Sequence, residues 1–285
     1  MASVFLKNKA SCRTALRLTV LLACALLSGC TAMLFQPMAQ HVYTPDVVQL
    51  DYTDLALHTA DGLILHGWKL MARGEHKGSI VFLHGNGENI STHFGNLYWL
   101  MYSGYDGYIF DYRGYGKSQG IAELDGVIRD AAAMIDHVIR QTPDDKKVIV
   151  IGHSLGGALA IHAVANSPDK DRIATLVTIE AFSDYRAVTR DVLATSWLTW
   201  ALQWPASLTI NNDYAPLDFV AGVSPVPLLI LHSRRDRLVP FYHAERLYRV
   251  ALPPKRLAEI DSDHNHIFNH EKNRRLLLDY LNALE

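Results

Sequence analysis

Cysteine is almost absent from this sequence of 285 residues, which has three, all within its first thirty positions. Residues 31–285 therefore offer no thiol for a disulfide, a zinc–thiolate site or a cysteine nucleophile. A surplus of basic residues is absent too. The first 29 residues hold four basic side chains and no acid, so the remainder carries 27 − 4 = 23 basic against 29 acidic residues. This mildly acidic body argues against nucleic-acid binding, because phosphates demand a basic face.

Internal repeats, low-complexity tracts and an obvious interdomain linker are also missing. Hydrophobic residues make up 49% of the chain, which is enough to bury a full core and excludes disorder as the main state. At this length one α/β domain and two small domains are both open, so the order of the elements has to decide.

The first thirty residues resemble an export signal rather than a part of the fold. Basic residues up to Arg17 precede an apolar run that ends in Leu27-Ser28-Gly29-Cys30. This ending resembles a bacterial lipobox, in which the Cys30 sulfur takes a diacylglyceryl group. An uncleaved membrane anchor over 18–35 and an ordinary cleaved signal are the alternatives.

The lipobox interpretation assigns a location as well as a modification. It predicts a signal peptide at 1–29, a tether at 30–45 and a folded domain at 46–285. The protein would be attached to the bacterial cell envelope through lipidated Cys30. Thr31, in place of an aspartate, favours the outer membrane, facing the periplasm, by resemblance.

Short apolar runs and amphipathic helices alternate along the rest of the chain. This pattern predicts an α/β fold with a mostly parallel sheet covered on both faces, preceded by a hairpin that turns at 60–62. The expected strands lie at 55–59, 63–70, 78–83, 108–111, 147–151, 173–179, 226–231 and 256–260. The expected helices lie at 91–103, 122–140, 155–166, 242–250 and 268–284.

A candidate nucleophile stands where one buried strand meets a helix. The motif Gly152-His153-Ser154-Leu155-Gly156 is weak as a string, but a strand-to-helix elbow would hold Ser154 in a strained backbone and expose its hydroxyl. The glycine-rich loop His84-Gly85-Asn86-Gly87 follows an earlier strand. We expect the backbone N–H groups of Asn86 and Leu155 to form an oxyanion hole, with His84 ordering the loop.

A serine nucleophile needs a base and an orienting acid, and both are available after later strands. Asp236 is the expected acid, kept ionised by the flanking residues Arg234, Arg235 and Arg237, with Asp184 as its competitor. His264 is the expected base because it stands nearer the strand end, with His266 as the runner-up. A metal site remains a further alternative, built from Asp261, Asp263, His264, His266 and His270.

With these residues in place, the chain from Tyr43 onward resembles the α/β-hydrolases. It is most similar to the branch of serine aminopeptidases and monoacylglycerol lipases. The resemblance is carried by the segments 59–62, 84–87, 111–118, 152–157, 236–240 and 264–265. It implies an eight-stranded sheet, no cofactor and an acyl-enzyme, with Ser154 as nucleophile, His264 as base and Asp236 as acid. Arg113 would tie a loop beside the site.

Two positions depart from the pattern of that branch. Ser233 stands where glycine is usual, and Asp263 replaces the glycine before the histidine. The acidic neighbour would raise the basicity of His264 or turn it away, so the choice between His264 and His266 stays open.

The segment 183–223 interrupts the alternation and is expected to form a short helical cap. Trp197, Trp200 and Trp204 follow one another at helical spacings of three and four. They would pack on the core, form an apolar wall for an acyl group, or face the bilayer.

These features together predict a lipid-anchored serine hydrolase acting on small carboxylic esters or related acyl bonds, without a cofactor or a metal. An amidase resembling the aminopeptidases is one alternative and would need an acidic pocket, for which Asp184, Asp191 and Asp213 are candidates. A catalytically inactive fold that serves as an envelope binding protein is the other.

Overall fold

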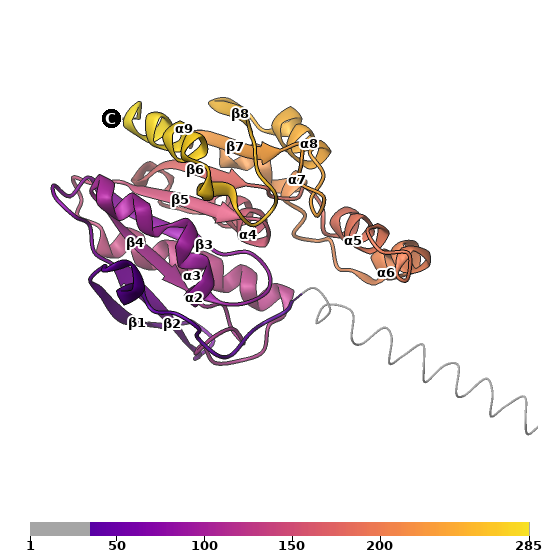
Figure 1. The fold of residues 1–285 in the computed structure, drawn as a ribbon, viewed down its shortest axis with the longest axis horizontal. Helices are drawn as coiled ribbons and strands as arrows, with labels where there is room; N and C mark the ends of the chain where they lie inside the picture. The colour runs from indigo at the N-terminus through magenta and orange to yellow at the C-terminus, as the bar shows by residue number, and fades with distance from the viewer. Residues whose placement is uncertain (1–34, 285) are drawn as a thin grey trace, which may run out of the picture.

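The eight strands of the computed structural model, which describes residues 35–284, form one sheet in the order β1-β2-β4-β3-β5-β6-β7-β8 (Figure 1). The pairs β1–β2 and β2–β4 are antiparallel and all other neighbours are parallel. The predicted α/β fold with a mostly parallel eight-stranded sheet is therefore confirmed. The strands are β1 Tyr52–His58, β2 Ile64–Leu70, β3 Gly78–Leu83, β4 Tyr105–Phe110, β5 Val148–His153, β6 Ile173–Ile179, β7 Leu228–Ser233 and β8 Lys255–Ile260.

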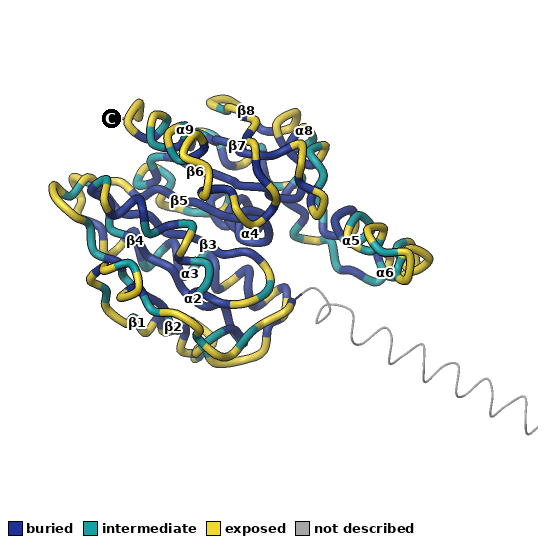
Figure 2. The backbone as a smooth tube through the Cα atoms, in the orientation of Figure 1, coloured by how far each residue is buried: buried dark blue, intermediate teal, exposed yellow. Residues whose placement is uncertain are grey.

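Helices cover both faces of this sheet, and successive side chains along a strand point to opposite faces. On β3, Val81 packs in one core with Val127 and Leu159, whereas its neighbour Ile80 packs in the other core with Leu277. The helices are α2 Ile90–His93, α3 Leu124–Gln141, α4 Leu155–Ala165, α5 Tyr185–Ala194, α6 Gln203–Thr209, α7 Pro216–Phe219, α8 Tyr242–Val250 and α9 Glu271–Asn282. In Figure 2 the central strands are buried, whereas the edge strands β1 and β8 carry exposed residues.

Three expected elements differ in extent. The helix expected over 91–103 is instead the single turn α2 followed by two 3-10 helices, Phe94–Asn96 and Tyr98–Ser103, because Gly95 and Asn96 favour a turn there. A 3-10 turn at Ile267–Asn269 precedes α9. Strand β7 begins only at Leu228, because Pro227 has no N–H to give to the ladder.

The N-terminal segment lies against the body from Phe35 onward. Phe35 is buried in the core, the N–H of Gln36 donates to Asn86 Oδ1 at 3.0 Å, and that of Met38 donates to the Glu88 carbonyl at 3.1 Å. The described part of the expected tether, residues 35–45, is therefore packed against the folded domain. The rest of it, together with Cys30 and the signal peptide at 1–29, lies outside the described residues. Within 35–284 no helix is both long and apolar enough to cross a membrane.

The connection between β6 and β7 carries α5, α6 and α7, and the α5–α6 pair projects from the end of the sheet (Figure 1). The three tryptophans do not share one helix: Trp197 lies in the turn after α5, Trp200 begins a 3-10 helix and Trp204 lies in α6. They are 85%, 61% and 63% exposed, so the expectation that they pack on the core is wrong. The helical spacing misled because the chain turns between them.

Candidate active site

Ser154 occupies a sharp elbow between β5 and α4. Its φ of 52° is in the left-handed region, where a residue with a side chain is strained. The flanking glycines are required by contact: a Cβ at Gly152 would lie 2.4 Å from the Gly156 carbonyl oxygen, and one at Gly156 would lie 2.0 Å from the Leu83 carbonyl oxygen. The elbow therefore places the Ser154 hydroxyl at the carboxyl end of the parallel strands, where ligand sites form in α/β sheets.

A histidine and an aspartate from later loops complete a row with this hydroxyl. His264 Nε2 lies 3.0 Å from Ser154 Oγ, and His264 Nδ1 lies 2.7 Å from Asp236 Oδ2. The N–H groups of Leu238 and Val239 donate to Asp236 Oδ1 at 2.8 and 2.9 Å, which fixes the carboxylate. The structure thus brings Ser154, His264 and Asp236 together in the geometry of a nucleophile, its base and an orienting acid.

The charges of the row support one another. Burial lowers the pKa of His264, but its contacts with the Asp236 and Glu180 carboxylates outweigh burial and raise it above its usual value. Burial alone would raise the pKa of Asp236, yet His264 and the two backbone N–H groups hold it below its usual range. Two of the flanking arginines pair with other acids, contrary to expectation. Arg234 pairs with Glu259 at 2.9 Å and Arg235 with Asp261 at 2.6 Å.

The choice between the two histidines is decided by position. His266 is 62% exposed and its Nδ1 contacts Asp263 at 2.8 Å, away from the serine. The acid before His264 therefore binds His266 and leaves His264 in place. The carbonyl of His264 accepts from the buried His153 ring at 2.9 Å, which adds a further hold on the base.

The loop after β3 lies beside the serine. Asn86 and Leu155 both line the cavity that contains Ser154. Leu155 is the first residue of α4, so its N–H has no partner within the helix and is available to an oxyanion. His84 is fully buried, its Nδ1 lies 2.8 Å from the Gly85 carbonyl, and burial lowers its pKa to about 3. A neutral His84 that orders the loop agrees with the expected role.

Arg113 ties the loop after β4 to α3 and to the turn between β1 and β2. Its Nε lies 3.0 and 3.1 Å from the two carboxylate oxygens of Asp130, its Nη2 lies 2.7 Å from Asp130 Oδ1, and its Nη1 lies 2.9 Å from Asp61. Arg113 and Asp130 are both buried. The guanidinium contacts no residue of the row and acts as a structural link, as expected.

The cavity at Ser154 has a volume of about 200 Å³ and is bounded by the cap. Cap residues such as Val188, Val192, Leu193 and Ala206 form its apolar wall. None of the described residues that line it carries a charge. Asp184 caps α5 through the Ala187 N–H, and Asp191 binds His243, so neither gives the acidic pocket that an aminopeptidase-like site would need.

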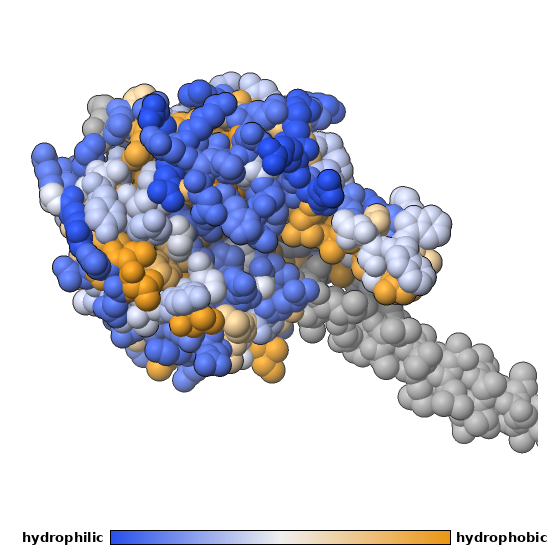
Figure 3. Space-filling model, viewed as in Figure 1, coloured by the Kyte–Doolittle hydropathy of each residue, from blue (hydrophilic) through white to orange (hydrophobic). Residues whose placement is uncertain are grey.

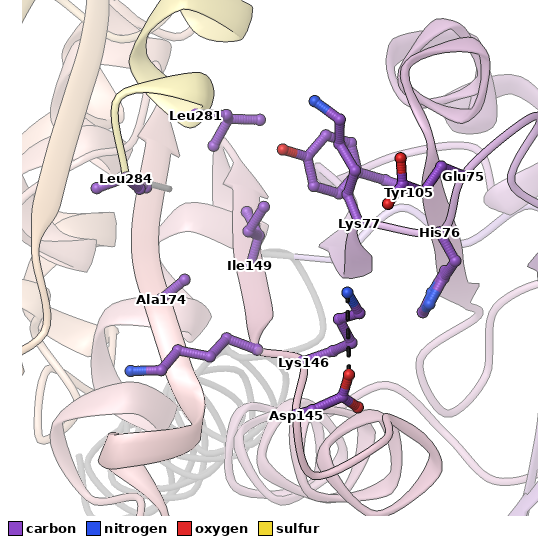
Figure 4. Close-up of a pocket in the computed structure, with 11 residues that line it drawn as sticks. Glu75, His76, Lys77, Tyr105, Asp145, Lys146, Ile149, Ala174, Leu281 and Leu284 are labelled. Carbon is purple, nitrogen blue, oxygen red and sulfur yellow. Dashed lines mark ion pairs between the residues drawn. The ribbon is translucent and has the colours of Figure 1, made fainter.

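A second depression, of about 400 Å³, lies at the opposite ends of the strands from Ser154 (Figure 4). It is formed at the amino ends of β4, β5 and β6 around Tyr105, Ile149 and Ala174, with charged side chains such as Lys146 and Asp145 at its rim. Ligand sites of parallel sheets form at the carboxyl ends of strands, so this depression is the weaker candidate despite its size.

Two histidine-carboxylate groups have the spacing of metal ligands among the described residues: His153, Glu180 and His264, and His41, His66 and Asp111. In the first, both ring nitrogens of His264 already contact Ser154 and Asp236. In the second, Asp111 holds the His41 ring at 2.8 Å and the Ile90 N–H at 3.0 Å. The alternative metal site at 261–270 does not come together as one cluster among the described residues, because Asp261 pairs with Arg235 and Asp263 with His266.

A second serine–histidine–aspartate arrangement joins the cap segment to α8. Ser183 Oγ is 2.9 Å from His243 Nδ1, and His243 Nε2 is 2.9 Å from Asp191. The Ser183 N–H also donates to Nδ1 at 3.1 Å, so this nitrogen is an acceptor and Nε2 carries the proton. Ser183 is fully buried and does not line the cavity. We therefore interpret this group as a structural tie between α5 and α8.

One acidic residue at the site was not anticipated from the sequence. Glu180 directly follows β6, is fully buried, and lies with its Oε2 3.1 Å from His264 Nδ1. Its position directly after a sheet strand could have identified it. The same reasoning selected Asp236, and it selected Asp184, which lies four residues after Glu180.

Comparison with known proteins places the chain in a family. Residues 74–221, more than half of the chain, match the family described as serine aminopeptidase S33. An uncharacterized protein YfhR of Escherichia coli O157:H7 is 29% identical over 235 residues, which cover 80% of this chain and 78% of that protein. The lysophosphatidylserine lipase ABHD12 of Xenopus tropicalis is 28% identical over 229 residues, covering 72% and 58%.

Solved structures give the same answer for the fold. The esterase Pf2001 of Pyrococcus furiosus superposes with a TM-score of 0.65 at 25% identity, covering 85% of this chain and 94% of that one. The matched family segment includes the elbow at Ser154 but ends before Asp236 and His264, so the structure alone joins these two to it. The chain belongs to the serine aminopeptidase S33 family of α/β-hydrolases.

Proposed function

We propose that this protein is a serine hydrolase that cleaves carboxylic esters with a single acyl chain. The observation that carries the proposal is the row of 3.0 and 2.7 Å contacts from Ser154 through His264 to Asp236, which opens into an uncharged cavity. Esterase and lipase are also the names of one structural neighbour and one relative. An intact row of this kind argues against a catalytically inactive binding protein.

The reaction would proceed in two steps. His264 accepts the Ser154 proton while Oγ attacks the ester carbonyl, and the N–H groups of Leu155 and Asn86 take the negative charge of the oxygen. The imidazolium then gives its proton to the leaving alcohol, which leaves an acyl group on Ser154. Water, activated by the same imidazole, releases the acid and restores the hydroxyl.

The location of the protein is part of the same proposal. We place it at the bacterial cell envelope, held by acyl chains on Cys30, because Leu27-Ser28-Gly29-Cys30 has the order of a lipobox. Several acyl chains on one residue hold a protein stably on a bilayer. The sequence after Cys30 favours the outer membrane.

A panel of p-nitrophenyl esters tests the proposed reaction. We expect kcat/KM to be highest for butyryl to octanoyl esters and about tenfold lower for acetyl and hexadecanoyl esters, because each methylene placed in an apolar wall contributes binding and a cavity of about 200 Å³ limits the chain. Aminoacyl p-nitroanilides should be poor substrates, because no carboxylate among residues 35–284 lines the cavity to bind a free amine. Faster cleavage of the anilides than of any ester would contradict the proposal.

A further inference from the structure

The outer side of the cap carries an apolar surface that the described residues leave uncovered. The side chains that form it are each more than half exposed; we call them the cap patch, and they are Trp197, Leu198, Trp200, Leu202, Trp204 and Leu208. In Figure 3 the α5–α6 end of the molecule is pale and orange, whereas much of the adjoining surface is blue. Contiguous apolar surface of this kind marks an interaction site in a folded protein.

The composition of the cap patch favours a lipid surface as its partner. No charged residue occurs between Asp191 and Asp213, so the patch offers nothing to pair with a charged protein or a nucleic acid. Tryptophan is enriched where a protein meets the boundary between lipid headgroups and acyl chains. Arg190 stacks 5.0 Å from the ring centre of Trp204 and adds a cation at the rim, where lipid phosphates lie.

The position of the cap patch points to the same partner. The inner side of the same helix pair lines the cavity through Val192, Leu193 and Ala206, and Gln36 lines that cavity as well. Gln36 stands six residues after Cys30, a length of chain that spans at most about 20 Å. Acyl chains on Cys30 would therefore hold a bilayer within that distance of the cavity.

We propose that the cap patch docks on the lipid bilayer that holds the anchor, so that the acyl chain of a membrane-borne ester passes from lipid into the cavity. This inference rests on the proposed ester hydrolysis and on the proposed anchor. The occupant is the bilayer itself, and a second copy of the chain is the alternative that the experiment has to separate.

Tryptophan fluorescence provides a direct test, because three of the five tryptophans lie on the cap and the other two, Trp68 and Trp99, are buried. The full-length protein would be reconstituted into vesicles of phosphatidylethanolamine and phosphatidylglycerol whose acyl chains carry bromine, a contact quencher. We expect loss of about half of the emission relative to unbrominated vesicles, since interfacial tryptophans reach the acyl boundary.

A matched reporter controls for nonspecific quenching. In the variant Trp197→Phe/Trp200→Phe/Trp204→Phe with Leu252→Trp, the reporter moves to an exposed site after α8, outside the cap patch, and the quenching should disappear. Absence of quenching in the unaltered protein overturns the docking, as does a cap-dependent dimer seen by light scattering without quenching. Hydrolysis of a soluble ester in the same sample reports separately on the proposed function.

An independent observation concerns Glu180. Its φ of 50° is in the left-handed region, and neither carboxylate oxygen has a well-formed hydrogen bond within the described part of the chain. A strained residue with a fully buried, poorly paired carboxylate is costly, and such residues cluster at functional sites. The nearest partner is His264 Nδ1, which lies 3.1 Å from Glu180 Oε2 and 2.7 Å from Asp236 Oδ2. Two carboxylates thus face one N–H group.

The geometry points to Glu180 as a second positioning residue for His264, which accepts the Nδ1–H together with Asp236 and replaces it when Asp236 is lost. No bond to Glu180 forms or breaks: the proton of Ser154 moves to Nε2, and Nδ1 keeps its own proton throughout. Burial, and then the negative charge of Asp236, raise the pKa of Glu180, whereas the contact with His264 lowers it.

Paired substitutions test this role. Loss of the orienting aspartate in a serine protease costs about 10⁴-fold, but here we expect Asp236→Asn to cost only about 10²-fold, because Glu180 still orients the imidazole. Adding Glu180→Gln to Asp236→Asn should bring the loss to about 10⁴-fold. Glu180→Gln alone should move the acidic limb of kcat/KM to lower pH, because removing an acidic partner lowers the pKa of His264 and a base works when unprotonated.

Asp184→Asn is the matched control, since this carboxylate lies four residues further along and caps α5. It should leave the acidic limb where it is and add nothing to Asp236→Asn. A Glu180→Gln protein with an unmoved limb, and equal losses in the single and double Asp236 variants, would overturn the inference. If Glu180→Gln fails to fold, Glu180→Asp in the Asp236→Asn background gives the same comparison.

Discussion

Replacing Ser154 with alanine is expected to lower kcat/KM for a soluble ester by about 10⁴- to 10⁶-fold, the range seen when a serine nucleophile is removed. The hydroxyl lies 3.0 Å from His264 Nε2, and the residue is only 8% exposed within the cavity. The N–H groups of Asn86 and Leu155 stay in place, so a small rate from oxyanion stabilisation should remain. Covalent labelling by a fluorophosphonate should be lost together with activity.

Ser183→Ala is the control for this substitution, because Ser183 also contacts a histidine that contacts an aspartate. It is fully buried and lines no part of the cavity, so labelling should persist. Equal melting temperatures of Ser154→Ala and the unaltered protein would show that the lost activity is chemical. Labelling that survives in Ser154→Ala and disappears in Ser183→Ala would exchange the roles assigned to the two serines.

Replacing Arg113 with methionine is expected to lower the free energy of unfolding by about 3–5 kcal/mol, the usual consequence of removing one partner of a buried ion pair. Asp130 would be left fully buried without the guanidinium that contacts both of its oxygens. The difference should be read from urea unfolding at neutral pH. The double variant Arg113→Met/Asp130→Leu should recover most of it, because no unpaired charge remains.

Arg129→Met provides a surface comparison, since Arg129 also contacts Asp61, at 3.5 Å, but is itself exposed. This substitution should lower the free energy of unfolding by at most about 1 kcal/mol.

The pH dependence of the free energy of unfolding gives a second check. Burial raises the pKa of Asp130 in the folded protein, and loss of Arg113 raises it further. The deficit of Arg113→Met should shrink as pH falls below this raised pKa, because the folded state then binds a proton that neutralises Asp130. Equal losses in the two arginine variants would contradict the structural role of Arg113.

The fold and most of the candidate site follow from local patterns. Apolar runs such as 173–179 coincide with β6, because a strand buried on both faces must be continuously hydrophobic. The elbow at Ser154 is visible because glycines are needed where a Cβ would meet backbone. Asp236 and His264 are visible because the carboxyl ends of parallel strands meet at one edge, which brings distant loops together.

Other features depend on contacts between segments that no local pattern records. The α/β class, the serine, and the order of acid and base can be read from the amino-acid order, since each rests on periodicity or on position after a strand. The packing of distant segments was needed to show that His264 rather than His266 reaches Ser154, that Arg234 and Arg235 pair with other acids, and that Glu180 faces the base. It also decided that the tryptophans point outward, because a turn after α5 replaces the single helix that their spacing suggests. Each of these features depends on how elements far apart in the sequence are oriented relative to one another. That orientation is decided by the packing of their side chains.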